Sequence, residues 1–237
     1  MPVDPAAPIT ITAFDWVPQF ARGQVRDLRV RWALEEVGQP YAVRCLPQGA
    51  QKQPGHVARQ PFGQVPTYEE GSLTLFESGA IVWHIAERFP GLMPAGPSAR
   101  ALSLEWSFAA LNTLEPPISD HAIATLFEAD EPWSRPRLPA IRARIDERLR
   151  AAADRLGDAE WFAGSFGPGD LLMVAVLRML EGDKLAAWPN LAAYVARGTA
   201  REAFQRALAD QLAGFTGAPP PEFLEWERQN QAKEQIA

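Results

Sequence analysis

The hydrophobic pattern of this chain changes once along its length, and that change limits the possible folds more than any other feature. Up to residue 91, short runs of period two alternate with helical stretches, whereas beyond residue 98 only three- and four-residue spacings occur. Period two is typical of half-buried strands, and the longer spacing is typical of helices with one buried face. We therefore expect an α/β half followed by an all-helical half.

The first half predicts the order β-α-β-loop-β-β-α. Its opening strand and helix lead into a second strand, and this βαβ unit should have a right-handed crossover. Residues 47–63, rich in Pro and Gly, predict a long loop with room for one short helical turn. A hairpin and a last helix follow, and we expect Ser78 to cap that helix. The expected strands cover 9–14, 41–45, 67–69 and 73–76, and the expected helices run over 24–37 and from Ser78 to the stop at Pro90.

The second half is predicted to contain helices only. We expect a first domain over 1–91, a linker over 92–98 and an all-helical domain over 99–237. The adjacent prolines 116 and 117 should kink or split the first helical stretch. The expected segments are 99–115, 118–128, 137–156, 168–181, 190–197, 200–212 and a charged exposed helix over 222–235.

Composition removes several classes of function. The net charge is -6 and Lys and Arg form no stripe, which argues against nucleic-acid binding. The single cysteine, Cys45, allows no intrachain disulfide and no cysteine-ligated zinc, and His56, His84 and His121 lack metal-ligand spacing, so no metal is expected. The start MPVDPAAP does not resemble a signal peptide and no apolar run could span a membrane, so we expect a cytoplasmic protein without membrane contact.

Two segments around the predicted hairpin carry a recognisable pattern: residues 60–66 (QPFGQVP) precede it, and residues 75–81 (LFESGAI) follow it. Together they closely resemble the glutathione-binding half of the cytosolic glutathione transferase family. Residues 161–171 (WFAGSFGPGDL) resemble the start of the family's buried helix. The resemblance implies a thioredoxin-like N-terminal domain, an all-helical C-terminal domain, glutathione as co-substrate and a homodimer.

The resemblance also assigns residues to parts of glutathione. It implies a cis Val65–Pro66 bond, which would turn the Val65 backbone outward to pair with the cysteine of glutathione like an added strand. The helix that begins at Ser78 offers free amides and a positive dipole end to the γ-glutamyl carboxylate, and Glu77 offers a counter-charge to the α-amino group. The expected glutathione-binding residues are Gln51, Gln64, Val65, Pro66, Glu77 and Ser78.

The residues that would bind the glycine end of glutathione match the family pattern less closely. Gln51 corresponds by its place in the long loop to a residue that reaches this end in related proteins. Its neighbours Lys52 or Gln53 could assist it.

The buried-helix motif is interpreted as structural. Gly167 is expected at the N-cap with Pro168 at the first helical position, and Asp170 should complete a variant capping box. Phe166 and Leu171 are placed as a hydrophobic staple.

The expected thiol-activating side chain is absent. The family usually supplies Tyr, Ser or Cys after the first strand, but residues 14–24 contain no Tyr, Ser, Thr or Cys. Only about 3% of a thiol with a pKa of ~8.5 is ionised at pH 7, so some group must stabilise the thiolate. Three alternatives stay open: Arg22 or backbone amides of this loop, a hydroxyl from Ser103, Ser107 or Thr113, or glutathione binding without conjugation.

Aromatic residues indicate a pocket for a second substrate. Trp16 and Phe20 lie in the loop that should border it, and Trp106 lies on the first helix of the second domain, whereas core packing is favoured for Phe108. The leading hypothesis is a glutathione transferase whose bound thiolate attacks a small hydrophobic electrophile, a reaction typical of detoxification. The alternatives are another glutathione-dependent enzyme (thioether lyase, isomerase or disulfide reductase) and a non-catalytic glutathione-binding module.

Overall fold

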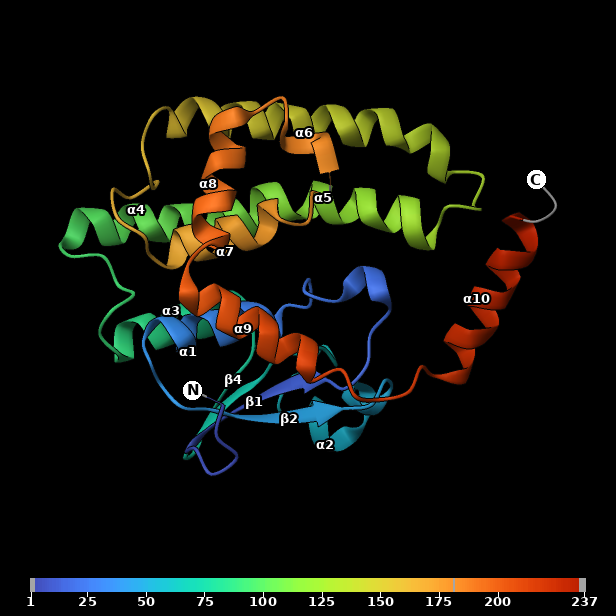
Figure 1. Cartoon of the computed structure of the whole chain (residues 1–237), viewed down its shortest axis with the longest axis horizontal. Helices are drawn as coiled ribbons and strands as arrows, with labels where there is room; N and C mark the ends of the chain where they lie inside the picture. The colour runs from blue at the N-terminus through green and yellow to red at the C-terminus, as the bar shows by residue number, and fades with distance from the viewer. Residues whose placement is uncertain (1–2, 181, 235–237) are drawn as a thin grey trace.

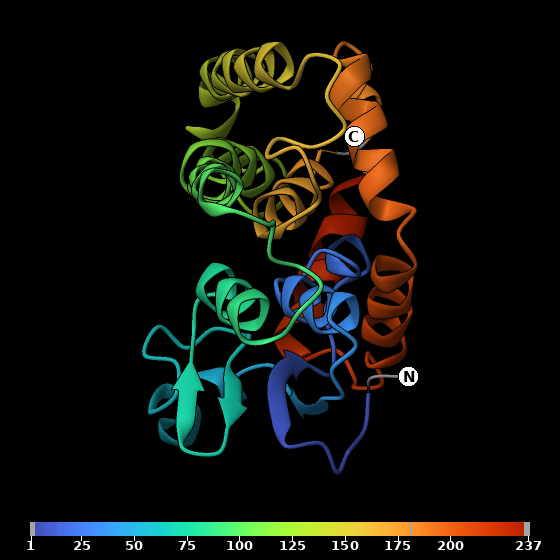
Figure 2. The ribbon, with the colours of Figure 1, turned by 90° about the vertical axis from the view of Figure 1, so that its left-hand side faces the viewer.

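A computed structural model describes residues 3–180 and 182–234 of the chain. The strands and the first three helices form one half, and helices α4 to α8 form a bundle above it (Figure 1). Helix α9 returns to pack along α1 of the first half, and α10 stands at the side of the molecule. The two views agree that the halves meet along α1, α3 and α7 (Figure 2).

The sheet of the first half has four strands in the order β2-β1-β3-β4. Strand β1 (Ile9–Phe14) pairs parallel with β2 (Ala42–Leu46) and antiparallel with β3 (Tyr68–Glu70), which pairs antiparallel with β4 (Leu73–Leu75). The bounds of β1 are those predicted, β2 and β3 each lie one residue later than predicted, and β4 ends one residue earlier. With its helices, this half has the thioredoxin-like order β-α-β-β-β-α that was expected.

The helices of the first half agree with the sequence pattern, with two differences. The expected long loop contains two short helical turns rather than one, and α1 begins three residues later than predicted because residues 22–26 form turns, with the Gln24 amide bonded to the Ala21 carbonyl. The elements are η1 (Gln19–Ala21), α1 (Asp27–Glu36), η2 (Ala50–Lys52), α2 (Pro54–Val57) and α3 (Ser78–Arg88).

The second half is helical throughout the described residues, as predicted. Its last expected segment reached Gln235, which lies outside the described part of the chain. The elements are α4 (Pro97–Phe108), η3 (Ala109–Leu114), α5 (Glu115–Ala122), η4 (Ile123–Phe127), α6 (Ser134–Leu156), α7 (Pro168–Leu177), η5 (Gly182–Leu185), α8 (Pro189–Thr199), α9 (Glu202–Ala213) and α10 (Pro221–Glu234).

The prolines at 116 and 117 do not split the first helical stretch, contrary to prediction. Helices α4 and α5 continue one another through η3, which is a π-helical turn (Figure 1). Its last bond runs from the Glu115 amide to the Ala110 carbonyl, five residues back. The wider turn gives the proline rings room against the preceding carbonyls and leaves the helix continuous.

Helix α7 lies in the centre of the second half, and all ten of its residues are buried. The predicted N-cap is confirmed, because the Gly167 amide donates to Asp170 Oδ2 at 3.2 Å. Asp170 Oδ1 also accepts from the Phe162 amide and the Tyr194 hydroxyl, at 3.0 and 2.9 Å. Burial raises the pKa of Asp170 to about 6 against the lowering effect of these donors.

Candidate functional site

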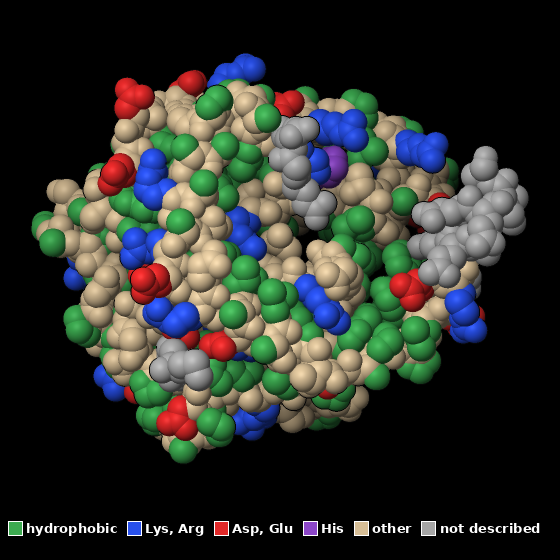
Figure 3. Space-filling view, in the orientation of Figure 1, with side chains coloured by type: hydrophobic (Ala, Val, Ile, Leu, Met, Phe, Trp, Pro, Cys, Tyr) green, Lys and Arg blue, Asp and Glu red, His purple; other side chains and the backbone are tan. Residues whose placement is uncertain are grey.

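Two cavities meet between the halves of the molecule. The larger, the α3 cavity, has a volume of about 700 Å³ and lies between the start of α3 and the α4–α5 stretch. The smaller, the loop cavity, has about 370 Å³ and is lined by Phe14, Gln24, Gln51, Val65 and Met179 among others. Both share the same four residues, Arg26, Arg29, Gln64 and Glu115, so they form one continuous cleft. The face drawn in Figure 3 is hollowed between the two halves.

An ion cluster joins the two halves where the cavities meet. Arg26 gives Nε–H and Nη2–H to Glu115 Oε1 at 3.0 and 2.8 Å, and Arg29 Nη1 donates to Glu115 Oε2 at 3.0 Å. The side chain of Arg26 is 46% exposed, whereas those of Arg29 and Glu115 are only 5% and 7% exposed. Burial acts to raise the pKa of Glu115, but the two arginines outweigh it and lower that pKa. Glu115 therefore stays ionised between two cations.

The start of α3 forms one wall of the cleft. Glu77 has φ +68°, a left-handed conformation that is uncommon for a residue with a side chain and that clusters at functional sites. Ser78 is the first residue of α3 and makes no capping bond, so the cap predicted for it is wrong. Its hydroxyl instead accepts a long hydrogen bond, 3.4 Å, from Arg29 Nη1. Both residues line the α3 cavity.

Gly79, the next residue, brings α3 close to the second half. A Cβ at Gly79 would lie 2.5 Å from Leu111 Cδ1 of η3. The absence of a side chain at this position lets the two elements approach.

The Val65–Pro66 peptide bond is cis, as the resemblance implied. The strand that follows is held to β1, because the Thr67 amide donates to Thr12 Oγ1 at 2.7 Å. Val65 lines the loop cavity beside Phe14, the last residue of β1.

The loop before this bond is fixed by two buried side chains whose roles the sequence did not reveal. Gln60 Oε1 accepts from the amides of Phe62 and Gln64 at 2.7 and 3.3 Å. His56 Nε2 lies 2.6 Å from the Gln64 carbonyl. Gln64 is thereby held where it lines both cavities.

Gln51 and Lys52 line the loop cavity and not the α3 cavity. Gln51 Oε1 accepts from the Gly49 amide at 2.8 Å, and Lys52 Nζ donates to the Phe62 carbonyl at 3.3 Å. The structure therefore brings Gln51, Gln64, Val65, Glu77 and Ser78, all predicted as glutathione-binding, to one cleft.

Arg22 is placed away from this cleft. Its guanidinium lies over the ring of Phe215, 5.6 Å from the centroid, and its Nε is buried without a hydrogen-bond partner among the described residues. The side chains of the β1–α1 loop that line the loop cavity are instead Gln24, Val25 and Arg26. Arg26 was not considered in the sequence interpretation.

The three hydroxyls considered as alternatives differ in position. Ser103 is buried and accepts from the Gly169 amide at 3.0 Å, while Thr113 is exposed. Ser107 lines the α3 cavity, but its hydroxyl donates to the Ser103 carbonyl and accepts from Trp83 Nε1, both at 2.8 Å. The single proton of the Ser107 hydroxyl therefore already makes a hydrogen bond and is not available to a thiolate.

The two aromatic residues of α4 are placed opposite to prediction: the one expected in the substrate pocket is buried, and the one expected in the core is exposed. Trp106 is 9% exposed and stacks on Phe162 at 3.8 Å, so it belongs to the core of the helical half rather than to a substrate pocket. Phe108, for which core packing was favoured, is 59% exposed and lines the α3 cavity.

Trp16 and Phe20 each contact an aromatic residue from the second half. Trp16 lies edge-on to Phe223 of α10 at 4.8 Å, and Phe20 lies edge-on to Phe127 of η4 at 5.8 Å. Hydrophobic side chains gather around the base of α10 in Figure 3. We call Trp16, Phe20, Phe127 and Phe223 the aromatic border, because their contacts join the β1–α1 loop to η4 and α10.

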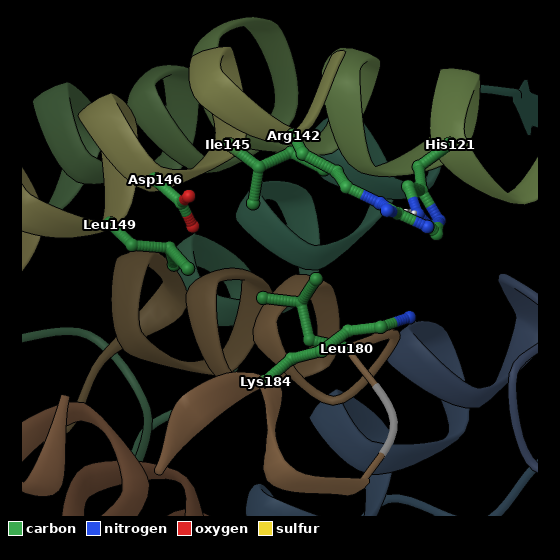
Figure 4. Close-up of a pocket in the computed structure, with 7 residues that line it drawn as sticks. All are labelled: His121, Arg142, Ile145, Asp146, Leu149, Leu180 and Lys184. Carbon is green, nitrogen blue, oxygen red and sulfur yellow. Dashed lines mark hydrogen bonds between the residues drawn. The ribbon is translucent and has the colours of Figure 1, made fainter. Parts of the chain in front are cut away.

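A further pocket of about 170 Å³ lies in the helical half, between α5, α6 and the segment that follows α7 (Figure 4). Arg142 Nε donates to His121 Nε2 at 3.4 Å, and Lys184 lies near them across the pocket from Asp146 (Figure 4). Burial lowers the pKa of His121, and the charges of Lys184 and Arg142 add to this. The charged residues line a small groove that holds none of the predicted site residues.

Comparison with known proteins agrees with the geometry. The family model described as glutathione S-transferase, N-terminal domain, matches residues 20–87. Glutathione S-transferase 4 of Zea mays is 29% identical over 204 residues, covering 81% of this chain and 90% of that protein. The glutathione S-transferase-like protein tpcF of Aspergillus fumigatus is 26% identical, over 81% of this chain and 94% of that protein.

Solved structures extend the match over both halves. A theta class glutathione S-transferase of Xanthomonas axonopodis pv. citri, with glutathione bound, has a TM-score of 0.72 and 27% identity and covers 85% of this chain and 97% of its own. Residues 20–87 match the family's N-terminal domain, and the chain is similar to glutathione transferases over both halves. A glutathione transferase of Phanerochaete chrysosporium, in complex with oxidized glutathione, shares the fold with a TM-score of 0.76 at 18% identity, over 88% of this chain and 98% of its own.

This chain differs from the usual glutathione transferase pattern at the thiol-activating position. Residues 14–24 carry no hydroxyl or thiol side chain, and the hydroxyls of Ser103 and Ser107 are engaged elsewhere. None of its described helices is long and apolar enough to cross a membrane.

Proposed function

We propose that this protein acts as a glutathione transferase, which binds glutathione across the two cavities and presents its sulfur to a hydrophobic electrophile. One observation carries the proposal: the Val65 backbone, the start of α3 and Gln51 all border a single cleft between the halves. These are the groups needed for the cysteine backbone, the γ-glutamyl end and the glycine end of the tripeptide.

The γ-glutamyl end would lie at the start of α3. The amides and dipole of that helix favour a carboxylate, and the buried Arg29 beneath Ser78 adds a positive charge. Glu77 supplies the negative charge for the α-amino group. The opposite charges of the two groups fix the direction in which glutathione lies.

The cysteine would pair with the Val65 backbone beside Pro66, as an added strand pairs with a sheet edge. Gln64, held by Gln60 and His56, borders the same stretch. Gln51 and Lys52 then remain for the glycine carboxylate, which suits one amide donor and one cation.

The electrophile would lie at the aromatic border, beside the sulfur. The exposed Phe127 and the half-buried Phe20 and Phe223 supply apolar surface, while Trp16, only 8% exposed, packs against Phe223. The thiolate forms a bond to an electrophilic carbon, and the leaving group departs with the electron pair of the broken bond. We propose conjugation of this kind, with the identity of the electrophile left to substrate screening.

A homodimer is part of the proposal. Three large apolar side chains are exposed: Leu104 and Phe108, at 43% and 59%, line the α3 cavity, and Phe62, at 63%, comes just before Gly63 and Gln64 of the loop cavity. A second copy would cover this surface, as exposed apolar patches of this kind commonly mark interfaces. Sedimentation of the wild type and of Phe62→Ser tests it, because a monomeric wild type would contradict the proposal. The same proposal places the protein in the cytoplasm, because a single thiol, Cys45, is typical of a reducing compartment.

Calorimetric titration with glutathione tests the binding pose. Ser78→Ala and Glu77→Gln should each weaken binding by about 1 to 3 kcal/mol, the range for loss of one partner of a charged hydrogen bond. Glu87→Gln, on the exposed side of the same helix where Glu87 pairs with Arg100, is the matched control and should bind normally. Equal affinity for all three variants would contradict the pose.

A further inference from the structure

The structure leaves the thiolate without the side chain that this family usually provides, and it places an unassigned arginine at the centre of the cleft. Resting on the proposed function, we propose that Arg26 is the catalytic residue that stabilises the glutathione thiolate. Arg22, which the sequence suggested, then has a structural role.

The first argument is position. In glutathione the cysteine lies between the γ-glutamyl and glycine residues, so its sulfur must fall between the start of α3 and Gln51. Arg26 lines both the α3 cavity, with Glu77 and Ser78, and the loop cavity, with Val65 and Gln51. It therefore borders the stretch of the cleft in which the sulfur must lie.

The second argument is the state of its guanidinium. Glu115 holds Nε and Nη2, which fixes the plane of the group, while Nη1 has no hydrogen-bond partner among the described residues. The side chain is 46% exposed and lines both cavities. A donor that is already oriented and still free loses little conformational freedom when it binds an anion.

The third argument is charge. Arg26 and Arg29 carry two positive charges against one on Glu115, so the cluster has an excess of one. In the proposed pose the α-amino group of glutathione pairs with Glu77, and the γ-glutamyl carboxylate takes up the positive charge of Arg29. Arg26 is then the cation that borders the place of the sulfur, and it favours the ionised thiol because an opposite charge within about 4 to 6 Å lowers an acid's pKa by ~1 to 3 units.

The neighbouring candidates are less suitable. Arg22 lies over Phe215 rather than in the cleft. Gln24 lines the loop cavity, but it is neutral and its Nε2 donates to the Arg178 carbonyl at 3.3 Å. Arg26 is thus the charged donor of the β1–α1 loop that borders both cavities.

The chemical step balances with this role. The thiol proton passes to water or buffer before the attack, and Arg26 keeps its own protons throughout because guanidinium does not lose a proton in this pH range. The sulfur lone pair forms the new C–S bond. With an aryl chloride as the electrophile, chloride leaves with the electrons of the C–Cl bond.

The test compares the pKa of enzyme-bound glutathione in four proteins, from its ultraviolet thiolate absorbance as pH is varied: the wild type, Arg26→Met, Arg26→Lys and Arg22→Met. We expect the wild type to hold the thiol pKa below its free value of about 8.5. Arg26→Met should raise it by ~1 unit or more and lower kcat/KM at pH 6.5 for an aryl chloride about tenfold. Arg26→Lys should retain part of the effect, and Arg22→Met should leave the pKa unchanged.

Calorimetry on the same proteins separates this inference from the proposed function. If the wild type does not bind glutathione, the proposed function itself is wrong. If it binds, and Arg26→Met leaves the thiol pKa and the pH profile unchanged, the role of Arg26 is wrong while the binding proposal stands. A rise in the thiol pKa with Arg22→Met but not with Arg26→Met would overturn the assignment directly.

Discussion

Helix α1 carries charged residues on two faces, and the faces differ in what lies opposite them. On the cleft face, Arg26 and Arg29 meet Glu115 of α5 beside two cavities. On the other face, Asp27 and Arg31 form an ion pair at 2.7 Å beneath α9, with side chains only 1% and 2% exposed. Gln211 of α9 closes this pair by donating to Asp27 Oδ1 at 2.7 Å.

The two faces show that an ion pair must be interpreted from its surroundings. The Asp27–Arg31 pair is enclosed, so no ligand can reach it and it acts on the packing of α1 against α9. The cluster of Arg26, Arg29 and Glu115 has one exposed member at a cavity, so its excess charge is available to an anion. Both consist of arginine paired with a carboxylate, and solvent access separates their roles.

The largest loss of stability is expected from a change in the Asp27–Arg31 pair on the enclosed face. Asp27→Ala leaves the buried Arg31 without its carboxylate, which should lower the free energy of unfolding by about 3 to 5 kcal/mol. Glutathione affinity of the folded protein should stay unchanged, because Asp27 does not border the cleft. Urea unfolding and calorimetry measure the two quantities, and a loss of affinity at full stability would show that the two faces are not separate.

A smaller loss of stability, which depends on pH, is expected from a change in the ion cluster on the cleft face. Glu115→Gln should destabilise the protein by about 2 kcal/mol near neutral pH, because the buried Arg29 loses a charged partner. The folded pKa of Glu115 lies below its ordinary value of 4.5, so its contribution is present above that value and is lost as pH falls through the folded pKa. Urea unfolding at a series of pH values should therefore show the wild type and the variant converging in acid. A constant difference would contradict the assigned ion cluster.

The smallest losses of stability are expected for ion pairs in which the arginine is exposed to solvent. Arg206 donates to the buried Glu35 at 2.7 Å but is itself 43% exposed, so Arg206→Ala should cost only about 1 kcal/mol. Arg44→Ala, which breaks an exposed pair with Glu69, is the control and should cost about 0.5 kcal/mol or less. If Arg206→Ala matched Asp27→Ala in unfolding experiments, burial would not be what distinguishes the pairs.

Local pattern was enough for most of the secondary structure. Alternating Ile and Thr predicted β1 with its observed bounds, and the helical spacing beyond residue 98 predicted a half without strands. The π-helical turn before Pro116 was missed, because whether a proline breaks a helix depends on the hydrogen bonds that the rest of the helix can rearrange.

The aromatic residues of α4 show where periodicity fails. Trp106 and Phe108 are two residues apart on a helix, so they face different directions. Which direction is buried depends on where α7 and the 161–162 segment pack, and the sequence of α4 does not contain that information.

The charged residues of the cleft were missed for a similar reason. Arg26 and Arg29 have the i,i+3 spacing that places them on one face of α1, and this spacing was visible in the sequence. Their partner Glu115 is 86 residues beyond Arg29, on an element of the other half. A charge that looks solvated along its own helix becomes part of a site only when another element closes over it.

By itself the sequence determined the order of strands and helices, the cis-proline motif and the start of α3, because each of these depends on residues that are close together in the chain. Only the tertiary structure decided which arginine faces the cleft, which aromatic residue is buried and which ion pair is enclosed. Burial and pairing are set by segments that are far apart in sequence, and they control both the energy of a charge and its access to a ligand.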